Sequence, residues 1–371
     1  MMPGSTFNCR ISGNLKVVTV SDQREADMKQ LLCGLLTAGL LFSSVAAAQT
    51  GQDQLQLKQD HPTEHVVVKG DTLWDISGHF LNRPWRWPEI WGVNPQIDNP
   101  HLIYPGDVIY LTWVDGQPRL GLRPGDGRLS PQVREMPLEQ AIPAISLRDI
   151  NSFISDNLVV QDDVLEQAPY VVGGDNRRLI TGAGDRAYAR GKLVRDDRNQ
   201  AVYRPAREYF DPVTGEFLGY ELFKVADAVI SAVQEDVISL DLQSSNEEVR
   251  ATYRVLPTEE TRIQSMFYPK PAPDGQEGLI IGLLKGVSSA GQYDAVVLNV
   301  GQREQIEPGH VFSIYRTGET IRDPVVNDTV QLPSEHAGIL MVFKSFDKVS
   351  YGLIMRATNV ISVGDEIRNP S

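Results

Sequence analysis

The pattern of apolar and polar positions changes character along the 371 residues of the chain. Residues 65–68 form a short β-branched run, and Leu73, Ile76 and Phe80 then follow at helical spacing. A second strand-like run occupies residues 108–111. From about residue 170 onward, short alternating runs are broken by Gly, Asp and Asn, as in VADAVISAVQEDVISLDL at 225–242 and in residues 337–341. The pattern predicts an α+β multidomain protein, in which a small strand–helix–helix–strand (βααβ) module precedes β-rich domains.

Residues that begin and end helices define the small module more closely. Thr72 is a good N-cap, and Asp75, three residues later, is placed to act as its capping-box partner. Pro84 and Pro88 should end this first helix and permit a second, short one. The sequence YPGD at 104–107 predicts a tight turn that leads into the last strand.

The same stretch resembles the LysM family at both of its ends. The family pattern V-x-x-G-D-T-L-W-x-I stands at residues 67–76, and N-P-x-x-I-x-P-G-D-x-I stands at residues 99–109. The resemblance implies binding of glycans that contain N-acetylglucosamine, which in bacteria means peptidoglycan, in a shallow groove between two loops. Carried over to this chain, the glycan-binding residues are Gly70, Asp71, Thr72, Leu73, Asn99, Pro100, His101, Leu102 and Ile103. Backbone amides in the turns would bind N-acetyl groups, and an apolar floor would cover the sugar face.

Several residues of the module have a structural interpretation as well as a functional one. We favour a core position over a ligand contact for Trp74, Ile76 and Ile109, because their spacing points them inward. We also favour a helix cap over a catalytic acid for Asp75. Three tryptophans could form a stacking platform for sugars, but a small domain also needs bulky side chains in its core, and we favour packing for Trp85, Trp87 and Trp91. The segment at 81–88 is longer than in the shortest LysM modules.

The N-terminal region indicates export. Lys29 precedes an apolar run at 31–45 and the sequence AAA at 46–48, which together are typical of a secretory signal peptide cleaved near Ala48. Met28 is then the expected start, and the mature protein is expected in the periplasm without a transmembrane anchor. Cys9 and Cys33 both precede the cleavage site, so the mature chain would have no disulfide and no thiol chemistry.

The charge of the chain excludes one class of partner. The sequence holds 35 basic and 48 acidic side chains, and removal of residues 1–48 takes away 4 and 3, which leaves 31 − 45 = −14. A chain this acidic repels phosphate backbones, and no basic cluster with interleaved aromatics offsets the charge. We therefore expect no binding to nucleic acid.

The β-rich region contains a faint internal repeat. The sequence VYR at 202–204 precedes DPV at 211–213, and IYR at 314–316 precedes DPV at 323–325 at the same interval. The sequence therefore predicts a duplicated β-unit, and the Asp-Pro-Val-x-Gly segment at 211–215 is expected to form a hairpin turn. Before the repeat, Leu147, Ile150, Ile154 and Leu158 predict a short helix that begins at Ser146. The expected divisions are residues 1–48 (leader), 49–62 (linker), 63–113 (LysM-like), 114–145 (linker), 146–269 (helix and β-domain) and 270–371 (C-terminal β-domain).

The C-terminal part also resembles a known family. Residues 278–370 contain GHVFSIYR, then LPSEHAGILMVFKSF, then SYGLIMRATNVISVGDEIRNP. With a LysM-like module near an exported N-terminus, this arrangement resembles the TsaP family of secretin-associated periplasmic proteins of type IV pilus systems. The C-terminal region of that family is similar to that of the flagellar protein FlgT. The resemblance implies a non-catalytic anchor that tethers an outer-membrane secretin to peptidoglycan. Where the family has Gly-Asp before the last strand, the first unit has Ala251 and Thr252.

The main alternative is a peptidoglycan hydrolase, and a scaffold for another envelope machine such as the flagellar basal body is a further one. A hydrolase needs a thiolate, a zinc site, paired carboxylates or a serine elbow, and no such constellation occurs in the mature sequence. Asp162–Asp163 and Glu247–Glu248 have the pattern of solvated charges. Glu335 and His336 form the one pair worth testing, and a cap or turn is the favoured interpretation for them. The sequence thus predicts no catalytic residue, no metal ligand and no cofactor.

Overall fold

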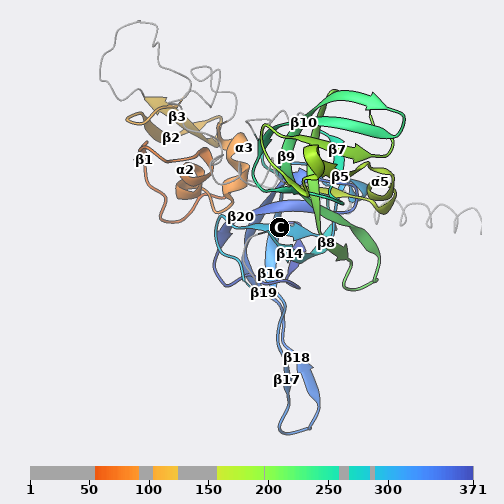
Figure 1. The fold of residues 1–371 in the computed structure, drawn as a ribbon. Coiled ribbons are helices and arrows are strands. Elements are labelled where there is room, and N and C mark those ends of the chain that lie inside the picture. Colours follow the sequence, from red (N-terminus) through yellow and green to blue (C-terminus); the bar gives the residue numbers. More distant parts are fainter. Residues whose placement is uncertain are drawn as a thin grey trace, which may run out of the picture. The chain divides into compact units, whose positions relative to one another are not determined.

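A computed structural model describes residues 55–91, 103–123, 157–195, 197–258, 267–284 and 289–370. These residues form a small N-terminal module and two barrels (Figure 1). Strands predominate and helices are few, so the α+β class predicted from the sequence holds only loosely. Among the described residues, no helix has the length and apolar character needed to cross a membrane.

The N-terminal module packs three short helical segments against a three-stranded antiparallel sheet. The sheet has the order β1 (Glu64–Val66), β2 (Val108–Val114), β3 (Gln117–Arg123). The helical segments are α2 (Leu73–Phe80), η1 (Pro84–Arg86) and α3 (Trp87–Trp91). The expectation that a linker begins at residue 114 is wrong for β3, which pairs with β2 over its whole length. Because β3 is an edge strand, it tolerates Pro118, the residue that made this segment resemble a linker.

The core of the module confirms most of the packing assignments. Ile76 and Ile109 are fully buried in it, as the spacing predicted. Trp87 and Trp91 belong to the same core, which supports packing over a sugar platform. Trp74 and Trp85 are also buried, although they are not members of this core. The core consists of Val67, Leu73, Ile76, Phe80, Leu81, Trp87, Ile90, Trp91, Ile103, Ile109 and Leu120.

The first barrel is a closed ring of six antiparallel strands. Its strands are β5 (Tyr170–Gly174), β7 (Arg186–Arg190), β8 (Asn199–Phe210), β9 (Phe217–Gln234), β10 (Val237–Ser245) and β12 (Arg254–Pro257). Around the ring the order is β5-β7-β10-β9-β8-β12, and β12 pairs back to β5. A short pair, β6 (Ile180–Thr181) and β11 (Val249–Arg250), and a 3-10 turn, η3 (Asp175–Arg177), accompany it.

Two elements precede the first barrel. Strand β4 (Asn157–Val160) pairs in antiparallel fashion with residues 220–223 of β9, and helix α5 (Asp162–Gln167) follows it. The predicted helix therefore cannot include Leu158, which lies in β4, while residues 146–156 lie outside the described residues. Asp162 and Asp163 are exposed in the first turn of α5, where their charge is favourable to the helix dipole.

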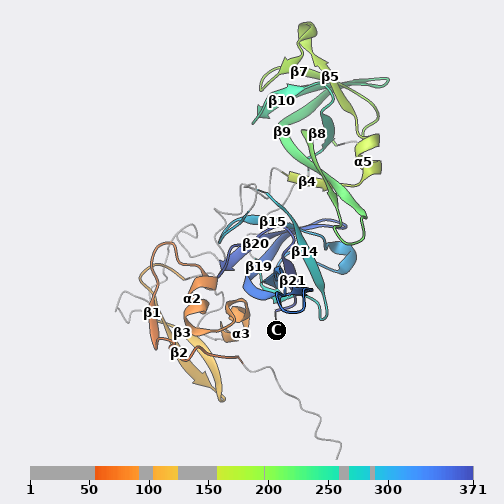
Figure 2. The ribbon, with the colours of Figure 1, turned by 90° about the horizontal axis from the view of Figure 1, so that it is seen from below.

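The second barrel is also a closed antiparallel ring of six strands. Its strands are β14 (Glu277–Leu283), β15 (Ala295–Leu298), β16 (His310–Arg316), β19 (Glu335–Ser345), β20 (Ser350–Ala357) and β21 (Glu366–Arg368). Their order is β14-β15-β20-β19-β16-β21, and β21 pairs back to β14 (Figure 2). A 3-10 turn, η4 (Gln302–Glu304), lies between β15 and β16. The short strand β13 (Lys270–Pro271) adds in parallel to β16.

The two barrels share one connectivity. Numbered along the chain from one to six, the strands of each follow the ring order 1-2-5-4-3-6. The register agrees as well: Tyr203 lies opposite Arg254 in the first barrel, and Tyr315 lies opposite Glu366 in the second. These tyrosines belong to the two repeated sequence segments, so the structure supports a duplicated β-unit.

The repeated Asp-Pro-Val segments occupy equivalent places. The first forms the tip of the hairpin between β8 and β9. The second forms the tip of a hairpin made by β17 (Thr320–Arg322) and β18 (Thr329–Gln331), which extends from β16 and β19 (Figure 1). The predicted hairpin turn at 211–215 is confirmed, and the structure shows a second hairpin turn at the repeated segment.

Candidate functional site

The first loop of the predicted groove joins β1 to helix α2. The turn is closed by the Asp71 amide, which donates to the carbonyl oxygen of Val68 at 3.2 Å. Gly70 has φ +105°, a conformation that favours glycine, and a Cβ at this position would meet open space. The backbone of Gly70 is therefore exposed at the surface of the loop, as an amide that binds an N-acetyl group needs to be.

The carboxylate of Asp71 holds this loop from the inside. Its Oδ2 atom accepts a hydrogen bond from the Val68 amide at 3.0 Å and lies 2.8 Å from His65 Nε2. Because a carboxylate accepts here, His65 Nε2 must carry the proton. The His65 ring in turn stacks on His79 of α2, with ring centroids 4.9 Å apart. Asp71 thus links the strand, the loop and the helix, so its carboxylate acts first as a brace for the loop.

The hydroxyl of Thr72 is committed to the helix. Thr72 Oγ1 accepts from the Asp75 amide at 3.1 Å and donates to Asp75 Oδ2 at 2.7 Å. The predicted cap is confirmed, although the Asp75 carboxylate binds the hydroxyl of Thr72 and not its amide. Such a cap stabilises a helix by about 1 kcal/mol.

The second loop of the groove is joined to the first by backbone hydrogen bonds. Val67 donates its amide to the Asp107 carbonyl and accepts from the Gly106 amide, both at 2.8 Å. The turn is closed by Asp107, a fully buried residue whose Oδ2 accepts from the Tyr104 amide at 2.9 Å. The structure therefore brings the first LysM signature next to residues 103–109, the described part of the second. Of the predicted residues in this half, Ile103 is described, and Asn99, Pro100, His101 and Leu102 lie outside the described residues.

Burial separates the predicted residues by what they can contact. Leu73 and Ile103 are completely buried, so their side chains form the floor of the fold and cannot touch a ligand. The exposed apolar surface beside Gly70 comes from Val66 and Val68, which are 54% and 56% exposed. Sequence reasoning missed these two valines, although the alternation of His65, Val66, Val67 and Val68 along a strand indicates which of them face outward.

His79 is the titratable group of helix α2 that lies against His65. Partial burial lowers the pKa of His79, assisted by the nearby charge of His65 and Lys58. His79 is therefore neutral at physiological pH, and it stacks on His65 without adding a positive charge. No group of three or more potential metal ligands occurs within the described part of the chain.

The other candidate chemistry does not converge on a site. Glu335 and His336 are exposed at the start of β19, so the expectation that they form a cap or turn is wrong. The centroid of the His336 ring lies 5.6 Å from that of Tyr315 in an edge-to-face contact. The partial desolvation of the His336 ring, followed by the charge of Arg356, lowers its pKa. Glu247 pairs with Arg204 at 3.1 Å and is half exposed, as expected for a solvated charge.

Comparison with known proteins agrees with the geometry of the joined loops. Residues 65–112 match the family described as LysM domain. The chain carries a LysM domain. It is also 37% identical over 60 residues to the uncharacterized protein YqbP of Bacillus subtilis, a match that covers 14% of this chain and 27% of that relative. The chain thus spans about a quarter of the length of YqbP. Strand β3, which completes the sheet, lies just beyond the matched residues.

Proposed function

We propose that this protein is a non-catalytic periplasmic anchor that binds peptidoglycan through its LysM domain and holds an outer-membrane secretin ring of a type IV pilus system. The observation that carries the binding half is the pair of loops joined at Val67. Their polar side chains are used to hold the loops, which leaves exposed backbone at Gly70 and exposed apolar surface at Val66 and Val68 for a sugar. A surface of this kind suits an N-acetylglucosamine polymer. The two described carboxylates of the loop, those of Asp71 and Asp75, are hydrogen-bonded to protein groups, which favours a structural role over the acid pair of a glycosidase.

The two barrels supply the other half of the proposal. Two copies of one β-unit, covalently joined to a wall-binding domain, have the architecture of an adaptor. The resemblance of the C-terminal region to secretin-associated proteins favours a secretin as the second partner. One shallow groove binds weakly, but many copies around a ring raise the effective concentration of the remaining grooves, so the assembly holds where a single copy would dissociate.

A bridging experiment tests the whole proposal. Purified sacculi are mixed with the detergent-solubilised secretin, with and without the mature chain, and then sedimented. We expect the secretin in the pellet only when the full chain is present, and we expect a chain that lacks residues 63–123 to leave it in the supernatant. Secretin that stays in solution with the full chain, while the chain itself sediments, would refute the tether and leave the wall-binding function standing.

The hydrolase alternative is tested in the same preparation. Zymography of the mature chain on peptidoglycan gels should show no cleared band. A cleared band that survives purification would replace the anchor with an enzyme. Co-purification with flagellar basal bodies in place of the secretin would assign the chain to a different envelope machine.

A further inference from the structure

The hairpin tips of the two barrels are built alike, residue by residue. In the first, Asp211 Oδ1 accepts from the amides of Val213 and Thr214 at 2.9 and 2.7 Å. In the second, Asp323 Oδ1 accepts from the amides of Val325 and Val326 at 2.7 and 3.2 Å. The backbone bonds that close the turns also correspond: Asp211 donates to the Glu216 carbonyl and Asp323 to the Asp328 carbonyl. Glu216 is therefore equivalent to Asp328, and Leu218 is equivalent to Val330.

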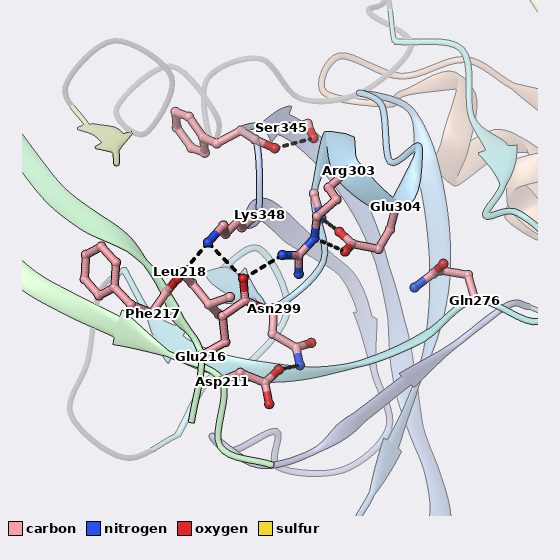
Figure 3. A network of polar contacts seen from close by, with 12 residues as sticks. Asp211, Glu216, Phe217, Leu218, Gln276, Asn299, Arg303, Glu304, Ser345 and Lys348 are labelled. Atoms are coloured by element: carbon pink, nitrogen blue, oxygen red, sulfur yellow. Dashed lines mark hydrogen bonds and ion pairs between the residues drawn. The ribbon is translucent and has the colours of Figure 1, made fainter. Parts of the chain in front are cut away.

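The first tip is docked against the second barrel (Figure 3). Glu216 Oε1 accepts from Arg303 Nη1 at 2.7 Å and from Lys348 Nζ at 2.8 Å. The Lys348 ammonium also donates to the Phe217 carbonyl at 3.0 Å. These contacts, the hydrogen bond to Arg303 first, lower the pKa of Glu216 to about 2.

An amide and an apolar contact complete this dock. Asn299 Nδ2 donates to Asp211 Oδ2 at 2.8 Å (Figure 3). Leu218 is 1% exposed and lies in one cluster with Val297 and Tyr351 of the second barrel. We call this contact the internal dock. In it, the basic pair Arg303 and Lys348 and an adjacent apolar strand face bind a hairpin tip that is acidic and apolar.

The second tip presents the same groups to solvent. Val325 is 90% exposed and Val330 is 44% exposed, where its equivalent Leu218 is buried. In the described part of the chain, Asp328 makes no ion pair, and all residues of β17 and β18 are exposed. An isolated two-stranded hairpin is marginally stable in water, and exposed valines at its tip add to the cost of leaving it uncovered.

Neither of the two sites that correspond to the internal dock suits Asp328 in the described residues of a second copy of this chain. Its basic pair is already filled by its own Glu216. In the first barrel, the turn between β9 and β10 is equivalent to the turn that supplies Lys348, but it carries Glu235 and Asp236. Two acidic residues would repel Asp328, so the charges favour a different protein.

We propose that the β17–β18 hairpin is the arm by which the chain docks on a partner protein whose surface carries two adjacent basic side chains beside an apolar strand face. The inference rests on the proposed function, in which that partner is the outer-membrane secretin. The tip valines enter the apolar face, and Asp328 takes the position between the two cations that Glu216 takes in the internal dock.

Binding of the mature chain to the detergent-solubilised secretin ring tests the arm. The test variants are Val325→Ser with Val326→Ser, and Asp328→Lys in a separate chain. The matched control is Val213→Ser, the same residue type at the same turn position of the docked tip, where the side chain is also exposed. All three changes lie at the surface, so thermal unfolding should stay near wild type. We expect each test variant to lose roughly tenfold or more in affinity, and the control to bind like the wild type.

Three other outcomes would contradict the arm, the proposed partner or the choice of a different protein over a second copy. Wild-type affinity in both test variants would remove the arm and leave the secretin tether intact. A wild-type chain that fails to bind the secretin would remove the proposed partner and the arm with it. Sedimentation of the chain alone should give a monomer, and a dimer that the Val325→Ser/Val326→Ser variant abolishes would show that the arm binds a second copy instead.

Discussion

The brace at Asp71 yields the sharpest prediction about glycan binding. Replacing Asp71 with Ala removes the acceptor for the Val68 amide at 3.0 Å and for His65 Nε2 at 2.8 Å. Hydrogen bonds to a charged group contribute roughly 1.5–3 kcal/mol each when buried. The Asp71 side chain is 17% exposed, so hydrogen bonds to water replace part of this free energy. We therefore expect the closed loop to lose about 2 kcal/mol in total.

This loss should appear as weaker binding, because the proposed contact between the Gly70 backbone and a sugar requires the closed loop. A cost of about 2 kcal/mol corresponds to roughly a 30-fold lower affinity. Titration calorimetry with a tetramer of N-acetylglucosamine measures it directly. The matched control is Asp71→Asn, whose amide oxygen can accept both hydrogen bonds, and we expect it to lose about fivefold or less.

Two results would refute the brace. Binding by Asp71→Ala that equals the wild type would show that the loop needs no such support. A loss in Asp71→Asn as large as that in Asp71→Ala would show that the negative charge itself contacts the glycan.

Four further predictions concern the barrels. Thr252 is exposed and has φ +77°, and the equivalent position of the second barrel holds Gly364. Thr252→Gly should therefore raise the free energy of unfolding of the first barrel by about 1 kcal/mol in urea. A lower urea midpoint would contradict the equivalence of the two positions. Leu218→Ala should lower the free energy of unfolding by about 3 kcal/mol, measured by the same method, because it empties a fully buried contact. Glu216→Gln should lower the melting temperature at pH 7. Because the pKa of Glu216 is lowered to about 2, the difference in melting temperature from wild type should shrink as the pH falls below 4.5 and vanish near pH 2. Burial disfavours the charged form of Glu221 and raises its pKa. Glu221→Gln should therefore raise the melting temperature at pH 7 and raise it less near pH 4. An increase in melting temperature that does not depend on pH would show that the charge is not the cause.

The LysM domain was predictable because its signals are local. The Thr72 cap, the prolines after the first helix and the Tyr104–Asp107 turn each act within a few residues, and all are found. Strand β3 was missed because Gln117 and Pro118 have loop composition, whereas the strand depends on its pairing with β2. The brace at Asp71 was also out of reach, since it depends on His65 six residues earlier and on the fold that brings them together.

The barrels were predictable as strands but not as closed rings. Alternation and turn residues identify β9, β10 and β19, but ring closure depends on pairs such as β14 with β21, which lie far apart in sequence. The continuous apolar sequence AVVL of β15 did contain a further signal. Its residues alternate between the cluster inside the second barrel and the cluster that includes Tyr209 and Leu218, so both faces of the strand are buried.

The two hairpin tips also differ in a way that depends on contacts between distant segments of the chain. The sequence predicted a hairpin turn at 211–215, and the structure shows turns of one kind at both repeated Asp-Pro-Val segments. Sequence could not distinguish the docked tip from the exposed one, because the difference lies in Arg303 and Lys348, which reach Glu216 from distant segments.

Sedimentation of the mature chain with purified sacculi tests the central claim most directly. The full chain should appear in the pellet under mild salt, and Asp71→Ala should shift it toward the supernatant, while a chain without residues 63–123 should remain soluble with both barrels folded. A full chain that stays in solution, or a deletion variant that sediments as well as the wild type, would contradict the claim that this LysM domain holds the protein to the wall.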